Sequence, residues 1–254
     1  MQQPEFTTLS LTLADQIAEV RLNRPDKSNA INEAMWQEIR QAFAWIDATP
    51  EARVVILSGA GKNFCAGIDL AMLAGVQQRI AHADGARSRE ALRRLILDLQ
   101  DCLSSLERCA KPVIAAIQGA CVGGALDLVT CCDLRYASAD ATFSIKEIDI
   151  GMVADVGTLQ RLPRLIGEGQ ARELAYTGRT LNGQEAEKLG LANRLFATPA
   201  ELEAGVRQIA RNIAAKAPLA IRGTKEVLNY SRDHSIADGL NFVATWNAAT
   251  LLSG

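Results

Sequence analysis

Three carboxylates lie close together in an otherwise apolar stretch, SIKEIDIGMVADVGT, which spans residues 144–158. They are Glu147, Asp149 and Asp155. Acids that share a low-dielectric site raise each other's pKa values toward the range in which a carboxyl group exchanges protons near neutral pH. The alternative is that the segment is extended, with Glu147 and Asp149 on one solvent-exposed face, and that Asp155 caps a helix beginning near residue 157.

A fourth acid, Asp127, follows two glycines in GGALDLVTCC, where its immediate neighbours are apolar. Its simpler role is to stabilise the dipole of a helix from the first turn. Two glycine-rich loops, SGAGKNFCAGIDL (58–70) and IQGACVGGALDLV (117–129), each follow an apolar segment. Such a loop presents backbone N–H groups at the start of a helix, and two N–H groups aimed at one point stabilise an oxyanion. Tight turns are the structural alternative for either loop alone.

Taken together, the acids and the loops predict proton abstraction α to a carbonyl group, with backbone donors holding the enolate. Other chemistries have little support. The sequence contains neither GxGxxG nor a P-loop lysine pattern. Its two histidines, His82 and His234, lie far from the loops in sequence, and the six cysteines show no CxxC spacing, which argues against a zinc site. We expect the cysteines to be buried and reduced.

Composition excludes several classes of protein. A net charge of −2 and a pI of about 5.8 give no attraction to nucleic acid or to an anionic membrane. No apolar run reaches the roughly 20 residues that span a bilayer. The basic segment RSREALRR (87–94) has the spacing of a solvated helix face. The start of the chain lacks the features of a signal peptide, so we expect a cytoplasmic protein.

The elements that must position these residues alternate between strands and helices. Short strands are predicted at residues 10–13 and 18–22, followed by a helix over residues 33–46 that Asn32 caps. The segment RVVILSGAG (53–61) is typical of a buried parallel strand that leads into a loop. This alternation predicts an α/β fold with buried parallel strands.

Helical patterns dominate two longer regions. Residues 84–110 have the spacing of a long amphipathic helix, and from residue 199 onward the pattern is helical to the end. We therefore divide the chain into a core, residues 1–198, and a helical region, residues 199–254, which we expect to serve oligomer assembly.

Several motifs resemble the enoyl-CoA hydratase/isomerase, or crotonase, superfamily. They are NRPDKSNAIN, FCAGIDL, KPVIAAIQGACVGGALDLVTCCDLRYAS and RLPRLIG. The resemblance runs from about residue 5 to the end, and FSIKEIDIGMVADVGTLQRLPRLIG is most similar to the Δ3,5-Δ2,4-dienoyl-CoA isomerases of fatty-acid β-oxidation. It implies a crotonase-type spiral of ββα units with a C-terminal helical trimerisation region, assembled as a homotrimer or as a dimer of trimers.

The resemblance also implies an acyl-CoA thioester substrate and no metal or redox cofactor. By motif position, the thioester oxygen lies between the backbone N–H groups of Ala66 and Gly124. The residues implied to run beside the acyl-CoA are Ala66, Gly67, Ile68, Asp69 and Leu70. Those implied to lie near its nucleotide end are Arg24, Asn29 and Ala30.

The acids distinguish related activities within the superfamily. Hydratases carry glutamates at the positions of Asp127 and Glu147, whereas this chain has a shorter first acid and a third acid, Asp155. Moving two double bonds removes a proton from C2 and adds one at C6, and these carbons are roughly 5 Å apart, beyond the ~3 Å reach of one fixed group. The resemblance implies Asp155 and Glu147 as the proton-transfer pair, with Asp127 assisting. We assign C2 to Asp155 and C6 to Glu147, and regard Asp149 as structural.

Two alternatives stay open from the sequence. One is an enoyl-CoA hydratase with an atypical set of acids. The other is a non-catalytic relative that binds RNA, against which the negative net charge argues. The chain also stops soon after TWNAATLLSG, without a peroxisomal C-terminal tripeptide, which favours a bacterial-type cytoplasmic enzyme.

Overall fold

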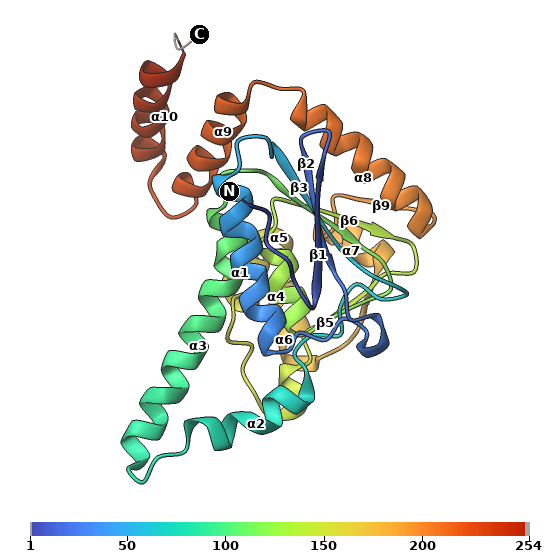
Figure 1. Ribbon diagram of the computed structural model, residues 1–254, viewed down its shortest axis with the longest axis vertical. Coiled ribbons are helices and arrows are strands. Elements are labelled where there is room, and N and C mark those ends of the chain that lie inside the picture. Colours follow the sequence, from blue (N-terminus) through green and yellow to red (C-terminus); the bar gives the residue numbers. More distant parts are fainter. Residues whose placement is uncertain (1, 252–254) are drawn as a thin grey trace.

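The computed structural model describes residues 2–251, and its centre is a twisted six-stranded sheet (Figure 1). In spatial order this main sheet consists of β1 (Leu9–Ala14), β2 (Ile17–Leu22), β3 (Val54–Gly59), β4 (Val113–Ile117), β6 (Leu134–Ser138) and β9 (Arg194–Phe196). The first two strands form an antiparallel hairpin, and the other pairs are parallel. A small second sheet contains β5 (Ala120–Val122), β7 (Thr142–Ser144) and β8 (Leu181–Asn182). The predicted hairpin and buried parallel strand are confirmed.

Helices cover both faces of the main sheet, which explains the nearly continuous apolar sequence of its central strands. Val54 and Ile56 of β3 pack with the buried residues of α8 (Pro199–Ala214) on one face. Val55 and Leu57, which point the other way, belong to the larger core beneath α1 (Glu33–Ala48) and α3 (Gly85–Arg108). The Asn32 side chain caps α1, as predicted, by accepting from the Met35 N–H at 3.0 Å.

Short helices carry the chain around the remaining edge of the core. They are α2 (Leu70–Ile80), α4 (Gly124–Thr130), α5 (Thr158–Ile166), α6 (Glu168–Thr177) and α7 (Gly183–Leu189). Two single 3₁₀ turns occur at Pro25–Lys27 and Glu147–Ile150. The second corrects the extended alternative for the acidic segment: the Met152 N–H returns to the Glu147 carbonyl at 2.9 Å, and Gly151 has a φ of 71°. The acids therefore do not alternate along a strand.

The C-terminal helices divide into two groups. α8 packs on the main sheet, whereas α9 (Pro218–Ser231) and α10 (Ile236–Thr250) form a pair that extends beyond it (Figure 1). We call residues 218–250 the C-terminal arm. α8, the first helix of the predicted helical region (residues 199–254), therefore covers one face of the sheet that belongs to the predicted core (residues 1–198). Within residues 2–251 no helix is both long and apolar enough to cross a membrane.

Candidate active site

A cavity of about 260 Å³ lies between the two glycine loops, the acidic segment and the helices α2 and α3. Its apolar wall consists of Trp36, Leu73, Val76, Leu92, Leu95, Ile96, Leu99, Ile150 and Met152. The polar groups that line it come from both loops and from Lys146, Glu147 and Asp155. Two other hollows in the molecule are larger, but neither is lined by these groups. An apolar cavity lined by a few polar groups is the usual form of a small-molecule site.

The two glycine loops lie directly against each other. The Cys65 N–H donates to the Ala120 carbonyl at 2.9 Å, and the Val122 N–H donates back to the Cys65 carbonyl at 3.1 Å. Gly67 has a φ of 90°, and a Cβ there would come within 2.5 Å of the Val122 oxygen, so a larger residue cannot stand at this crossing. The sequence could predict two loops, but not that main-chain bonds hold them side by side.

The structure corrects one of the two predicted oxyanion donors, Ala66. The Ala66 N–H already donates to the Ser28 carbonyl at 2.9 Å, so it is not available to a ligand. The next exposed donor along the loop is the Ile68 N–H, and a Cβ on Gly124 would lie 3.6 Å from this nitrogen. Among residues 2–251, no acceptor binds the N–H groups of Ile68 or Gly124. We call these two neighbouring donors the anion-binding pair, because unpaired backbone N–H groups can stabilise a negative charge.

Glu147 reaches the same place from the 3₁₀ turn. Its carboxyl group lies beside Gly123, where a Cβ would be 3.1 Å from Oε1, and Gly123 itself has a φ of 54°. Its Oε2 is buried and has no hydrogen-bond partner in the described part of the chain. Burial raises the pKa of Glu147, and the charge of Asp155 adds to this effect. A carboxyl group next to the anion-binding pair is suited to exchange a proton with a carbon near a bound carbonyl.

Asp155 lines the cavity from the loop before α5. It does not cap that helix, because the N-cap residue is Gly157 and makes no side-chain hydrogen bond. Its carbonyl oxygen instead accepts a hydrogen bond from Gln100 Nε2 at 2.6 Å. Burial raises the pKa of the Asp155 carboxyl group. The structure therefore brings Glu147 and Asp155 to one cavity from two consecutive turns of chain.

Asp127 stands behind this pair rather than in the cavity. It is fully buried, and it is not among the residues that line the cavity in the described structure. Its Oδ1 accepts the Thr158 N–H at 2.5 Å, and its Oδ2 has no partner within residues 2–251. Burial above all, and then the charge of Glu147, raises its pKa to about 7 against the hydrogen bonds from Thr158. The charges of Glu147 and Asp155 both contribute to this raised pKa, so Asp127 is coupled electrostatically to the two acids of the cavity.

Asp149 lies outside the cavity lining, and its side chain is 51% exposed. Its Oδ2 pairs with Lys146 Nζ at 2.9 Å, and the same ammonium group donates to the Gly178 carbonyl at 2.7 Å. The prediction that this third acid of the segment is structural agrees with these contacts.

The early motif NRPDKSNAIN supports the first glycine loop, and the side chains of Asn29 and Arg24 in it are engaged in contacts within the protein. Asn29 is fully buried, and its Nδ2 donates to the carbonyls of Ala60, Asn63 and Phe64. Its side-chain amide is therefore used fully within the fold, and its place near the nucleotide end of the substrate stays a prediction. Arg24 Nη1 pairs with Asp69 Oδ2 at 2.8 Å and also donates to the Ala30 carbonyl.

Asp69 and Leu70 lie where α2 begins, beside the cavity. Asp69 caps this helix, since its Oδ1 accepts the Ala71 N–H at 3.0 Å. Together with Arg24, this acid fixes the direction in which the loop leaves the anion-binding pair. Leu70 is 70% exposed and lines the mouth of the cavity, where it can contact a ligand.

No cysteine lines this cavity within residues 2–251. All six cysteines are buried and unpaired, as predicted, and burial raises the pKa of Cys65 to about 12. Its sulfur accepts the Gly67 N–H at 3.3 Å and contacts the Asn29 carbonyl at 3.0 Å. Within residues 2–251, no group of three or more His, Cys, Asp or Glu side chains is placed to hold a metal ion.

Comparison with known proteins gives a consistent result. The family model for enoyl-CoA hydratase/isomerase matches residues 12–249. The chain is 50% identical over 233 residues to the peroxisomal Δ3,5-Δ2,4-dienoyl-CoA isomerase of Arabidopsis thaliana, covering 91% of this chain and 84% of that protein. It is 44% identical over 248 residues to the mitochondrial Δ3,5-Δ2,4-dienoyl-CoA isomerase of Homo sapiens, covering 97% and 76%.

Solved structures agree with the fold. The enoyl-CoA hydratase of Bacillus anthracis superposes with a TM-score of 0.87 at 32% identity, over 96% of this chain and 91% of that chain. A structure from Thermobifida fusca, described as a putative enoyl-CoA hydratase in complex with acetoacetyl-CoA, superposes with a TM-score of 0.84 at 32% identity, over 96% and 94%.

One prediction is overturned by these relatives. The sequence favoured a cytoplasmic protein, but the dienoyl-CoA isomerases most similar to it among those described above are peroxisomal and mitochondrial. A short C-terminus and the lack of signal features do not identify a compartment in a family whose members work in several.

Proposed function

The chain belongs to the enoyl-CoA hydratase/isomerase family, and on this basis we propose that it converts 3,5-dienoyl-CoA thioesters into 2,4-dienoyl-CoA thioesters. The predicted crotonase-type fold and the predicted kind of enzyme are confirmed by the isomerase relatives at 44% and 50% identity and by the superposed structures. One observation supports the chemistry above the others: Glu147 and Asp155 line the same apolar cavity as the anion-binding pair. Such an arrangement suits two proton transfers at separate carbons of one bound chain.

The thioester carbonyl is proposed to accept hydrogen bonds from the N–H groups of Ile68 and Gly124. Loss of a proton from C2 then leaves a dienolate whose negative charge on oxygen these two donors stabilise. Because the thioester and its donors supply the electron sink, the reaction requires no metal or redox cofactor, and coenzyme A enters only as part of the substrate. The residues on either side of these donors, Ala66, Gly67, Asp69 and Leu70, are proposed to border the acyl-CoA.

The position of Glu147 supports a revised order of proton transfer. Its carboxyl group lies beside Gly123, next to the anion-binding pair, and C2 is bonded to the thioester carbon. Glu147 is therefore proposed to take the C2 proton, and a protonated Asp155 to deliver one at C6. This reverses the assignment made from the sequence. The C3=C4 and C5=C6 double bonds become C2=C3 and C4=C5, and the two acids exchange protonation states.

Raised pKa values suit this cycle, because one acid must be ionised and the other protonated at the same pH. Asp127 is proposed to assist without touching the substrate. It holds the Thr158 N–H at the start of α5, and its pKa responds to the charges of the other two acids.

Assembly as a homotrimer or a dimer of trimers is also proposed. Four large apolar residues of the C-terminal arm support it, since each is about half exposed or more: Leu219 (48%), Leu228 (67%), Ile236 (84%) and Leu240 (64%). Exposed apolar surface of this extent on paired helices usually marks an interface. Light scattering coupled to size-exclusion chromatography would distinguish a monomer, a trimer and a hexamer.

An enoyl-CoA hydratase is the second candidate, since solved relatives at 32% identity carry that description. The position of Asp127 disfavours a hydratase. This residue stands where hydratases of the superfamily carry a glutamate, but it does not line the cavity. Incubation with 3,5-octadienoyl-CoA and, separately, with crotonyl-CoA tests the choice. We expect the absorbance of a conjugated 2,4-dienoyl thioester to rise with the first and little bleaching with the second. Faster hydration of crotonyl-CoA than isomerisation would contradict the proposed function.

A further inference from the structure

Three polar side chains on α3 face the start of α5. Gln100, Ser104 and Glu107 follow one another at spacings of four and three residues, which places them on one side of the helix. We call them the α3 row. All three are part of the described chain, and each contacts either the loop that carries Asp155 or the first turn of α5.

The α3 row contacts the segment from Asp155 to Arg161 at two points. At one end, Gln100 Nε2 donates to the Asp155 carbonyl at 2.6 Å. At the other end, Arg161 Nη2 donates to Ser104 Oγ at 3.3 Å and to Glu107 Oε2 at 2.9 Å. The Asp155 backbone and the first turn of α5 are therefore both fixed to α3, the helix that also forms the apolar wall of the cavity.

Arg161 folds back over the loop it follows. Its backbone N–H donates to the Gly157 carbonyl at 3.1 Å, and a Cβ at Gly157 would lie only 1.9 Å from Arg161 Nη1. Gly157 also has a φ of 133°, which side-chain-bearing residues rarely adopt. The guanidinium group therefore occupies the space above residue 157, two positions after Asp155.

The ion pair between Glu107 and Arg161 is well shielded, with side-chain exposures of 18% and 17%. Burial alone would raise the pKa of Glu107, but the hydrogen bonds and charges of Arg161 and Arg232 outweigh it and hold that pKa below its usual value. A shielded, bidentate arginine–carboxylate pair fixes direction as well as distance. It is thus better shielded from water than the exposed pairs elsewhere on the molecule, such as that of Arg94 with Glu90.

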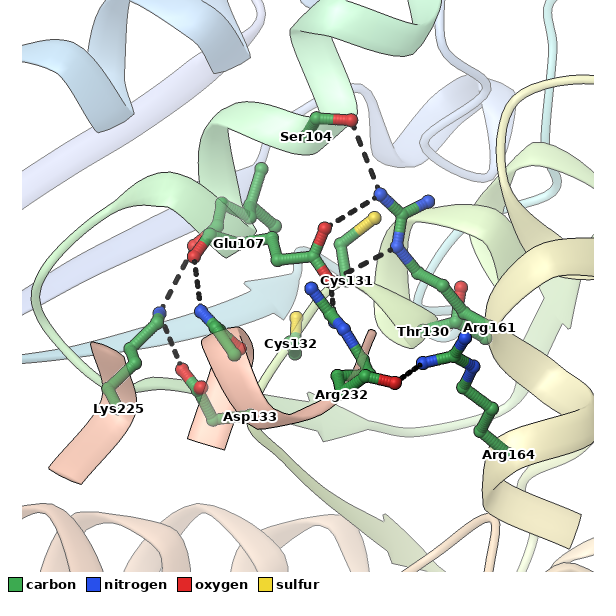
Figure 2. A network of polar contacts seen from close by, with 12 residues as sticks. Ser104, Glu107, Thr130, Cys131, Cys132, Asp133, Arg161, Arg164, Lys225 and Arg232 are labelled. Carbon is green, nitrogen blue, oxygen red and sulfur yellow. Dashed lines mark hydrogen bonds and ion pairs between the residues drawn. The ribbon is translucent and has the colours of Figure 1, made fainter. Parts of the chain in front are cut away.

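The same carboxylate also receives a residue from the C-terminal arm. Figure 2 shows Arg232, which follows α9, pairing with Glu107 Oε1, the oxygen that also accepts from Arg161 Nε. Arg164 Nη1 in turn donates to the Arg232 carbonyl at 2.6 Å. Nearby, Asn229 Nδ2 donates to the Glu107 carbonyl at 3.3 Å. Glu107 therefore joins the first turn of α5 to the arm.

We propose that Glu107 and Arg161 are positioning residues that set the place of the Asp155 carboxyl group in the cavity, and that Arg232 makes this placement depend on docking of the C-terminal arm. The inference rests on the proposed role of Asp155 in proton delivery. Neither positioning residue lines the cavity, so they act on the substrate only through the loop. A displacement of about 1 Å in a proton donor lowers a rate by up to ~10²-fold.

Steady-state kinetics of Glu107→Gln and Arg161→Gln test the proposal. We expect kcat for 3,5-dienoyl-CoA to fall about tenfold or more while KM changes less than about twofold, because the anion-binding pair is untouched. The milder Gln100→Ala removes only the bond to the Asp155 carbonyl and should act in the same direction. Asp98→Asn is the matched control, since Asp98 is another acid of α3 whose arginine partner, Arg40, lies on α1.

Two further measurements separate positioning from general weakening of the fold. Amide hydrogen exchange of residues 152–160 should accelerate in Glu107→Gln and stay unchanged in Asp98→Asn, and unchanged exchange in both would overturn the proposal. In an Asp155→Asn background, measured at high enzyme concentration, Glu107→Gln should give no further loss, whereas a second loss of the same size would also overturn it. Arg232→Ala should also accelerate the amide exchange of residues 152–160. Unchanged exchange in this variant would contradict the proposed dependence on docking of the C-terminal arm.

If the wild-type protein does not isomerise dienoyl-CoA at all, the proposed function fails, but the exchange measurement still decides whether the α3 row holds the Asp155 loop. The two failures are therefore distinguishable. Loss of kcat with an equal rise in KM would also contradict positioning, because it would mean that the variants disturb substrate binding instead.

Discussion

The Thr158 N–H donates to Asp127 Oδ1 at 2.5 Å, so a fully buried carboxyl group on α4 holds the first residue of α5. This bond ties the helix that presents the second glycine loop to the helix that follows Asp155. An acid that shares no surface with the cavity can thus affect the reaction by fixing where two cavity elements meet.

Substitution of Asp127 separates this role from direct catalysis. Asp127→Asn keeps an oxygen that can accept the Thr158 N–H, so we expect a loss of kcat below about tenfold. Glu147→Gln and Asp155→Asn should each reduce kcat by at least about 10²-fold, since each removes a proton-transfer group. Steady-state isomerisation assays on the three variants check this. An Asp127→Asn enzyme as inactive as Asp155→Asn would show that the buried acid takes part in proton transfer.

The stability of the protein should depend on pH through the same acid. The pKa of Asp127 is raised in the folded protein from an ordinary 3.8 to about 7, so between these values the folded state holds a proton that the unfolded state has lost. The free energy of unfolding therefore falls as pH rises through this interval. Urea denaturation at pH 5 and pH 8 should show a larger decrease for the wild type than for Asp127→Asn. Equal decreases would mean that Asp127 is ionised in the folded state.

Gly123 should tolerate no side chain. A Cβ at this position would lie 3.1 Å from Glu147 Oε1 on a backbone with a φ of 54°, so Gly123→Ala both strains the turn and displaces the carboxyl group. We expect kcat to fall by about 10²-fold with the fold retained. Gly169→Ala is the control, because it lies in α6 with no atom within 4 Å of its added Cβ. Circular dichroism of both variants checks that the fold is retained, and steady-state kinetics measure kcat. A fully active Gly123→Ala enzyme would contradict the assigned position of Glu147.

The sequence predicted the framework of the site better than its details. The strand and helix patterns follow from side-chain periodicity, which is local, so the hairpin, α1 and α3 were recognisable. The choice of Ile68 over Ala66 as a donor was not, because it depends on the Ser28 carbonyl, 38 residues before Ala66, already taking the Ala66 N–H. A positive φ at Gly67, which redirects the next N–H, is the physical signal that periodicity does not carry.

Long-range contacts also decide what the polar residues near the site can do. Asn29 looked available for a ligand, yet three carbonyl groups from residues 60–64 saturate its amide. Asp127 was predicted to assist the other two acids, and the packing of α4 beneath α5 places it outside the cavity lining. In both cases burial decided the role, and burial is a property of the whole fold.

Docking of the C-terminal arm should depend on Lys225, whose side chain on α9 is only 5% exposed. Its Nζ pairs with Asp133 Oδ2 at 2.8 Å and donates to the carbonyls of Lys111 and Leu106 at 3.1 and 3.3 Å, as Figure 2 shows in part. Lys225→Met leaves Asp133 and two carbonyl groups without this donor. Breaking a buried pair from one side destabilises a protein by about 3 kcal/mol or more.

Urea denaturation should therefore show a lower free energy of unfolding for Lys225→Met, or an early separate transition of the arm. Lys216→Met is the matched control, because Lys216 is exposed just before α9 and its substitution should change the unfolding curve little. Adding Asp133→Asn to Lys225→Met removes the unpaired charge and should recover part of the loss. If both lysine variants unfold alike, the buried ammonium group is not what fixes the arm to the core.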